Sequence, residues 1–123
     1  MIKTHESAED YLETILILKQ EKGMVRSVDI AQRMAYSKPS VSRAMGLLRQ
    51  NQYIVMDKDG WITLTDAGLE IAQRIYERHR FISSWLVRLG VTPEVAAQDA
   101  CRIEHDISTE TFEKIRAYIE AHP

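Results

Sequence analysis

The chain has 123 residues, of which 45% are hydrophobic and 28% charged, and its formal net charge at pH 7 is −2. This length can bury a core without disulfides, and no low-complexity tract indicates disorder. The single cysteine, Cys101, excludes an intramolecular disulfide and indicates a reducing compartment. The first residues lack the apolar stretch of a secretion signal, and the longest aliphatic run, 15–18, is too short to span a bilayer. We therefore expect a cytoplasmic protein with no membrane partner.

The first half of the sequence predicts three helices followed by a two-stranded hairpin. Their expected ranges are 8–21, 28–34, 39–51, 53–56 and 61–64. Ser7 is the candidate N-cap of the first helix, and Gly23 is placed to end it. Pro39 suits the first position of the third helix, where its missing N–H would have no partner. An Asp-Gly turn at 59–60 joins the two strands.

The second half predicts three more helices and no strand. The residues expected to begin them are Thr65, Thr92 and Ser108. Gly90 ends the first of these helices, which has apolar residues at helical spacing along its length. We expect a mainly α fold with an N-terminal domain over 1–64 and a helical domain over 65–123.

Two short helices joined by a tight turn and followed by a two-stranded wing form the order of a winged helix-turn-helix. The segment 30–56 has four basic residues and no acid, as expected of a surface that faces phosphate. Hydroxyls and cations at the start of the third helix can contact phosphates or base edges, and a lysine at the wing tip can add a phosphate contact. The candidate DNA-binding residues are Ser37, Lys38, Pro39, Ser40, Ser42, Arg43 and Lys58.

The same segment has a structural interpretation, in which Ser37 and Ser40 only cap a helix and Arg43 and Arg49 are solvated charges. Helix-turn-helix order also identifies no effector, because many unrelated regulators share it. The residues of the third helix expected to face the core are Val41, Met45, Leu47 and Leu48.

Six potential metal ligands occur on three predicted helices. They are Asp10, Glu13, His79, Cys101, Glu104 and His105. The first two are three residues apart and the last three have the spacing i, i+3 and i+4, so each set shares one helix face. Carboxylates, imidazoles and a thiol from three helices are enough for one or two divalent-metal sites.

Each of these residues also has an alternative role. Asp10, three residues after Ser7, suits a capping box, and Cys101 suits a small buried hydrophobic position. A histidine in an apolar stripe, such as His79, is usually a satisfied core residue. The members that suit a solvated surface are Glu13, Glu104 and His105.

Five segments together resemble the diphtheria-toxin-repressor family, including its manganese-regulator branch. They are Ser-Ala-Glu-Asp-Tyr-Leu-Glu-Thr-Ile at 7–15, Ser-Lys-Pro-Ser-Val-Ser-Arg at 37–43, Leu-Thr-Asp-Ala-Gly at 64–68, Tyr-Glu-Arg-His-Arg at 76–80 and Asp-Ala-Cys-Arg-Ile-Glu-His at 99–105. The resemblance implies a homodimer whose first half binds double-stranded operator DNA and whose second half dimerises and binds metal through the six candidate ligands. It implies repression of metal-uptake or homeostasis genes by Mn²⁺ or Fe²⁺, with Zn²⁺ or Co²⁺ substituting in vitro.

The chain departs from the family pattern in ways that affect the choice of metal. Asp10 matches the manganese branch and Cys101 the iron-type members, so the implied ligand set is a hybrid. Asp10 and the short chain favour Mn²⁺, with Fe²⁺ second. Ser83 and Ala97 replace a glutamate and a histidine of the iron-type ancillary site, which we expect to be absent or altered. The sequence ends at Pro123, without the SH3-like domain of longer members.

Two other functions compete with this interpretation. A winged-helix regulator that answers to an organic ligand or to Cys101 oxidation would bind DNA equally well in a chelator. A zinc enzyme built on Cys101, Glu104 and His105 would need an open coordination position, and the motif His-Glu-x-x-His does not occur. Candidate dimer-interface residues, which are equally core candidates, are Phe81, Trp85, Val95, Phe112 and Ile115.

Overall fold

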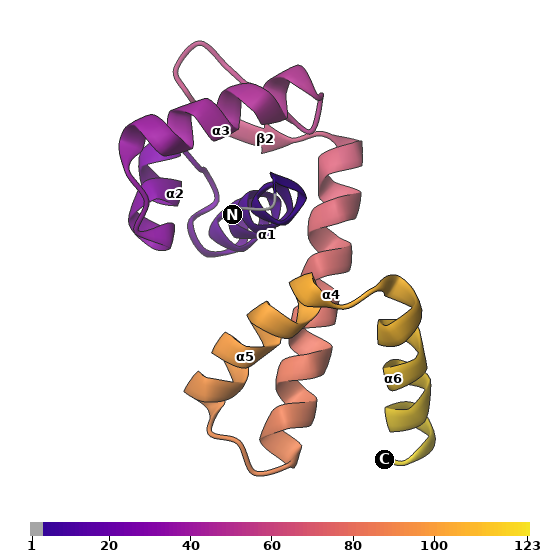
Figure 1. The fold of residues 1–123 in the computed structure, drawn as a ribbon. Helices are drawn as coiled ribbons and strands as arrows, with labels where there is room; N and C mark the ends of the chain where they lie inside the picture. Colours follow the sequence, from indigo (N-terminus) through magenta and orange to yellow (C-terminus); the bar gives the residue numbers. More distant parts are fainter. Residues whose placement is uncertain (1–3) are drawn as a thin grey trace. The chain divides into compact units, whose positions relative to one another are not determined.

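The structure is a computed structural model that describes the backbone of residues 4–123 and side chains from residue 8 onward (Figure 1). The described chain forms six helices and one antiparallel two-stranded sheet. In chain order these are α1 (Thr4–Lys22), α2 (Ser27–Met34), α3 (Lys38–Gln50), β1 (Ile54–Met56), β2 (Ile62–Leu64), α4 (Asp66–Arg88), α5 (Pro93–Asp106) and α6 (Thr109–Ala121). The predicted mainly α class and the order of its elements are confirmed.

Internal contacts divide the chain into two compact units, and the division falls within α4. The first unit ends at Arg74, and the second covers Ile75–Pro123. The first therefore contains α1 to α3, the hairpin and the first turns of α4, and the second contains the rest of α4 with α5 and α6. None of the described helices is both long enough and apolar enough to cross a membrane.

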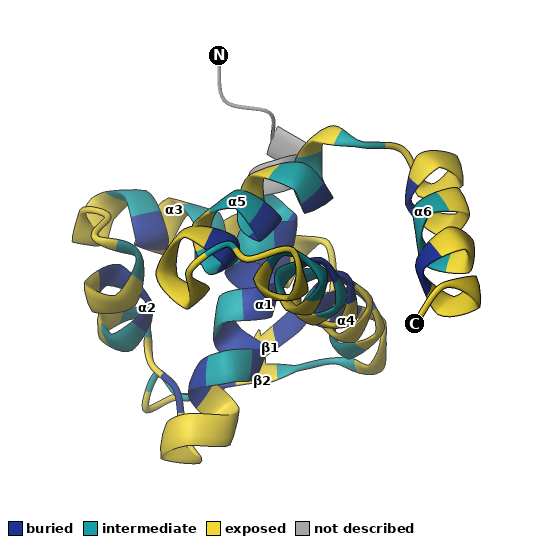
Figure 2. Cartoon of the chain, turned by 90° about the horizontal axis from the view of Figure 1, so that it is seen from below, coloured by how far each residue is buried: buried dark blue, intermediate teal, exposed yellow. Residues whose placement is uncertain are grey.

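α1 lies at the centre of the first unit and packs against α2, α3 and β2. Figure 2 shows buried residues along this helix. Each buried aliphatic side chain contributes roughly 1.5–3 kcal/mol, so α1 is part of the same core as the helix-turn-helix. The most deeply buried side chains of this core are Leu12, Ile15, Val25, Ile30, Val41, Met45, Ile54 and Ile62.

α1 begins at Thr4, earlier than predicted, and ends at Lys22. Ser7 is therefore not its N-cap, and its side chain lies outside the described residues. Asp10 falls in the second turn of α1, so the capping-box interpretation of Asp10 is wrong. Gly23 follows the helix with a φ of +84°, a left-handed conformation that glycine adopts without strain, as predicted.

α3 begins at Lys38, one residue before the predicted start, and Ser37 is its N-cap. The Ser37 hydroxyl accepts a hydrogen bond from the Ser40 backbone N–H at 3.2 Å. Pro39 takes the second helical position, where the backbone N–H also lacks an intrahelical partner.

One predicted core residue of α3 is wrong. Leu47 is 54% exposed, whereas Val41, Met45 and Leu48 are buried. The buried stripe follows the spacing i, i+4 and i+7, and Leu47 lies about 100° around the helix from Leu48.

The start of α4 is fastened to the segment that precedes β1. Thr65 accepts a hydrogen bond from the Gly68 N–H at 3.1 Å and donates one to the Gln52 carbonyl at 2.7 Å. A Cβ atom at Gly68 would overlap the backbone carbonyl oxygen of Tyr53. The Leu-Thr-Asp-Ala-Gly segment therefore needs its threonine as a cap and its glycine for close packing.

We expect Gly68→Ala to lower the free energy of unfolding by about 2 kcal/mol or more, because the overlap involves backbone that cannot rotate away. Gly46→Ala is the matched control, since Gly46 lies inside α3 with open space at its Cβ position. There the greater helix propensity of alanine should raise stability by about 0.5–1 kcal/mol. Urea denaturation measures both changes, and equal stability of the two variants would contradict the packing described at Gly68.

The second unit has its own apolar core, formed where α4, α5 and α6 meet. It centres on Ile82, Ala100 and Phe112, with Phe81 among the partly buried residues packed against it. The rings of Phe81 and Phe112 meet edge-on with centroids 6.0 Å apart. Phe112 is 2% exposed, so this candidate for the dimer interface is a core residue.

Candidate functional site

The second unit brings four of the six candidate ligands together. Cys101, Glu104 and His105 lie on one face of α5, as their spacing predicts, and His79 approaches them from α4. His79 Nδ1 is 3.3 Å from one carboxylate oxygen of Glu104, and His105 Nε2 is 3.4 Å from the other. Ligand atoms of Cys101 and His105 lie within 4.8 Å of each other.

Glu104 is 1% exposed, and its carboxylate oxygens accept no hydrogen bond from the described residues. A buried carboxylate in this state is costly in free energy unless positive charge lies close to it. The surface interpretation is therefore wrong for Glu104. It is also wrong for Glu13, which is 7% exposed, and for His105, whose side chain is 7% exposed.

The geometry of these side chains fits a divalent cation. Two ligand atoms that each lie about 2.1 Å from one ion are about 3.0 Å apart at a right angle and about 3.4 Å apart at the tetrahedral angle. The separation of His79 Nδ1 from the nearer carboxylate oxygen of Glu104, 3.3 Å, falls in this range. Imidazole, carboxylate and thiol donors together suit Mn²⁺, Fe²⁺, Co²⁺ or Zn²⁺.

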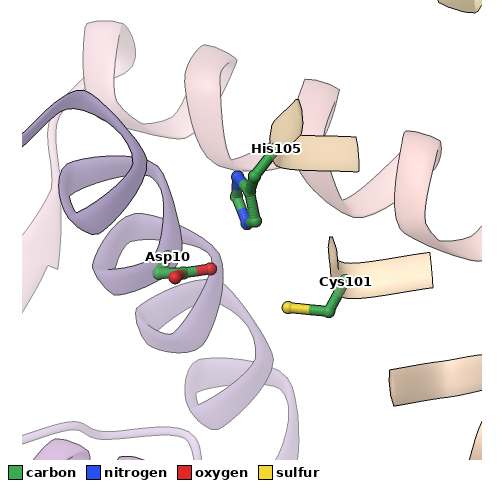
Figure 3. Close-up of side chains that lie close together, drawn as sticks. All are labelled: Asp10, Cys101 and His105. Atoms are coloured by element: carbon green, nitrogen blue, oxygen red, sulfur yellow. The ribbon is translucent and has the colours of Figure 1, made fainter. Parts of the chain in front are cut away.

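The two remaining candidate ligands, Asp10 and Glu13, lie in the first unit. They are separated by about one turn of α1, and this spacing places them on one face of the helix. Figure 3 shows Asp10 on α1 and, on α5, the side chains of Cys101 and His105 leaving the helix on the same side.

Tyr11, the neighbour of Asp10, connects α1 to the helix-turn-helix. Its ring is 6% exposed and meets the ring of Tyr36 edge-on, with centroids 5.9 Å apart and planes at 66°. Burial raises the pKa of the Tyr11 hydroxyl, Tyr36 and Asp10 raise it further, and the charge of Arg43 opposes the change. Asp10, a candidate ligand, is therefore adjacent in the sequence to Tyr11, which contacts Tyr36 in the turn that precedes α3. This contact has no signature in the sequence, because the two tyrosines share no periodic spacing.

Two ion pairs connect the C-terminal end of α1 to α2. Lys22 Nζ lies 2.7 Å from Asp29, and Arg33 donates to both carboxylate oxygens of Glu21 at 2.8 and 3.1 Å. The hydrogen bond from Lys22 lowers the pKa of Asp29, and the one from Arg33 lowers the pKa of Glu21. Lys22, Arg33 and Glu21 are exposed and only Asp29 is partly buried, so these pairs fix the direction of α2 relative to α1 more than they add stability.

The start of α3 presents most of the candidate DNA-binding residues to solvent. The Ser37 hydroxyl donates to Ser40 Oγ at 2.8 Å, and Arg43 Nη2 reaches the same oxygen at 3.4 Å. Ser37 therefore does cap the helix, and its exposure leaves it accessible to DNA as well. The other exposed candidates are Lys38, Pro39, Ser42, Arg43 and, in the wing turn, Lys58, whereas Ser40 is partly buried.

Comparisons with known proteins assign DNA binding to the first half of the chain and metal binding to the second. The model "Iron dependent repressor, N-terminal DNA binding domain" matches residues 3–61, and "Iron dependent repressor, metal binding and dimerisation domain" matches residues 65–122. The transcriptional regulator MntR of Escherichia coli O157:H7 is 37% identical over 95% of this chain and 76% of its own length. The chain belongs to the iron-dependent repressor family. Within this family, the HTH-type transcriptional regulator MntR of Bacillus subtilis is 34% identical over 91% of this chain and 79% of its own length.

Solved structures of iron-dependent repressor relatives share the fold. The manganese regulator SloR superposes with a TM-score of 0.79 at 28% identity, and a manganese-dependent transcriptional repressor in complex with manganese does so with 0.83 at 27%. The match covers 92% of this chain in both cases, and 53% and 52% of those chains, so this chain spans about half their length. Because the family consists of transcriptional repressors that bind divalent metal, the zinc-enzyme alternative is wrong.

We expect Glu104→Gln to remove most of the stabilisation that Mn²⁺ gives the chain, because the amide keeps the shape of the side chain but lacks its charge. For the wild type this stabilisation should reach about 2.7 kcal/mol at a free metal concentration of 100 times Kd. Glu94→Gln, at an exposed position in the first turn of α5, is the matched control and should keep it. Calorimetric melting in Mn²⁺ and in EDTA measures the difference. If Mn²⁺ raised the melting temperature of Glu104→Gln as much as that of the wild type, Glu104 would be excluded as a ligand.

Proposed function

We propose that the chain acts as a cytoplasmic, homodimeric repressor that binds operator DNA of metal-uptake or homeostasis genes when Mn²⁺ is bound, with Fe²⁺ as the second candidate. The observation that carries this proposal is the buried Glu104 carboxylate between two imidazoles, in a chain whose first half matches a DNA-binding domain. The proposed functional boundary follows Leu64, so that 1–64 bind DNA, and 65–123 dimerise and bind metal together with the carboxylates of α1. Zn²⁺ and Co²⁺ are expected to substitute in vitro.

We assign the ligands to two sets, each completed by one carboxylate of α1. The sets are Asp10 with Cys101 and His105, and Glu13 with His79 and Glu104. The second set has two carboxylates and suits Mn²⁺, whereas the thiol of the first raises affinity for Fe²⁺, Co²⁺ and Zn²⁺. The chemistry of the donors supports this assignment, because both sets combine imidazole with carboxylate.

The carboxylates of α1 couple metal binding to the helix-turn-helix. The carboxylates of Asp10 and Glu13 carry the same charge as that of Glu104. Bringing α1 close to Glu104 is therefore unfavourable until a positive charge compensates the repulsion. A bound divalent ion supplies the compensating charge and a common centre for the ligands. The bound ion then fixes the position of α1. Because α1 contacts Tyr36 and forms ion pairs with α2, fixing α1 also fixes α2 and the turn that precedes α3.

A dimer makes this coupling decisive for DNA binding. Two recognition helices must enter half-sites about 34 Å apart, or a multiple of this distance, so a small rotation of either one prevents both from docking. A shift from 1% to 99% of the binding-competent form needs about 5.5 kcal/mol of differential metal binding. A differential of this size is within reach of a multidentate site whose ligands come together in only one of the two forms. Partly exposed candidates for the dimer face are Phe81, Trp85, Val95 and Ile115.

We expect Asp10→Asn to weaken metal-dependent operator binding at least about tenfold, because one ligand charge is lost from α1 (about 1.4 kcal/mol). Fluorescence anisotropy with duplex DNA from the promoter neighbourhood, in Mn²⁺, anaerobic Fe²⁺, Zn²⁺ and EDTA, measures the effect and ranks the metals. Glu110→Gln, exposed in the first turn of α6, is the control and should bind as the wild type does. Equal wild-type affinity in Mn²⁺ and EDTA would contradict the proposal and favour an organic effector or Cys101 oxidation.

A further inference from the structure

The segment between α1 and α2 runs beside the wing. The Ile62 N–H of β2 donates a hydrogen bond to the carbonyl of Val25 at 2.8 Å, and the Val25 side chain is fully buried. The next residue, Arg26, places its guanidinium carbon 4.0 Å from the centroid of the Trp61 ring. Trp61 directly follows the wing turn at 57–60, so the guanidinium is stacked at the base of the wing.

The donors of Arg26 are not used within the part of the chain that the structure describes. Its guanidinium is exposed and forms no hydrogen bond and no ion pair with the described residues. Its charge acts on Asp29 only at longer range, and the hydrogen bond from Lys22 is the main cause of the lowered pKa of that carboxyl. The carboxylate of Asp29 accepts from the Arg26 backbone N–H at 2.9 Å and is paired with Lys22 at 2.7 Å. Stacking occupies the faces of a guanidinium and leaves its N–H groups free around the edge. Trp61 therefore holds this cation in place without consuming its donors.

The position of Arg26 in the fold indicates what its donors meet. When a helix-turn-helix docks on DNA, the helix before the recognition helix crosses the sugar-phosphate backbone. Here that helix is α2, and Arg26 is its N-cap. A guanidinium matches the oxygens of a phosphate in a two-pronged hydrogen bond, which an ammonium does not.

We propose that Arg26, held by Trp61, contacts a backbone phosphate and positions both α2 and the wing on operator DNA. This inference rests on the proposed DNA-binding function and adds a residue to it. A phosphate contact carries no sequence information, so Arg26 contributes equally to operator and unrelated duplexes. Lys58, exposed in the wing turn at 57–60, is a second cation that can contact the sugar-phosphate backbone.

The test compares three variants with the wild type in Mn²⁺, using anisotropy titrations on operator and unrelated duplexes over a range of KCl concentrations. Arg26→Gln removes the charge, whereas Trp61→Leu keeps the charge and removes the surface that holds it. Arg88→Gln, at an exposed position in the last turn of α4, is a matched control for the change in net charge. Thermal melting with and without Mn²⁺ checks that each variant folds and binds metal.

For Arg26→Gln we expect the slope of log K against log [KCl] to fall by about 1 per subunit, and affinity at low salt to fall roughly three- to tenfold on both duplexes. Trp61→Leu should lose affinity while keeping most of the slope, and Arg88→Gln should match the wild type. A wild-type slope in Arg26→Gln, or a loss confined to the operator, would overturn the inference and leave the proposed function intact. Failure of the wild type itself to bind DNA in Mn²⁺ would overturn both.

Discussion

A carboxylate removed from water has to be compensated by positive charge, and the geometry of the second unit is arranged around one such group. Glu104 is 1% exposed and faces His79 and His105 at 3.3 and 3.4 Å. The apolar core centred on Ile82, Ala100 and Phe112 lies in the same unit, where low dielectric makes an uncompensated charge more costly. This arrangement is unfavourable for a protein that only needs to fold, and favourable for one whose stability is to depend on a divalent cation.

In the proposed mechanism, α1 connects metal binding to DNA binding. One of its faces belongs to the core shared with α2, α3 and β2, and another carries the carboxylates of Asp10 and Glu13. The packing of Tyr11 on Tyr36 and the ion pairs with α2 connect this helix to both parts of the helix-turn-helix. Individually these contacts contribute little to stability, but a two-state switch needs a defined connection between its parts more than a strong one.

Local rules of the chain predicted most of the fold and the composition of the candidate site. The spacing of Cys101, Glu104 and His105 put them on one face because the helical period is fixed, and the capping residues Thr65 and Ser108 marked their helices correctly. The features that were predicted wrongly or not predicted at all depend on residues that are distant in the sequence. The burial of Glu104, the exposure of Leu47 and the overlap that excludes a side chain at Gly68 are set by packing between elements, which periodicity does not determine. The ion pair between Glu21 and Arg33 joins two helices and has no local signature.

Hydrogen–deuterium exchange of the intact chain, with Mn²⁺ and with EDTA, measures whether metal ligation joins α1 to α4 and α5. We expect Mn²⁺ to slow exchange in α1 and α5 together, because both helices lose their independent opening when they share a ligand set. In Glu104→Gln both effects should disappear. Slower exchange confined to residues 75–123, with α1 unchanged, would show that the metal is held by the second unit alone and would contradict the account.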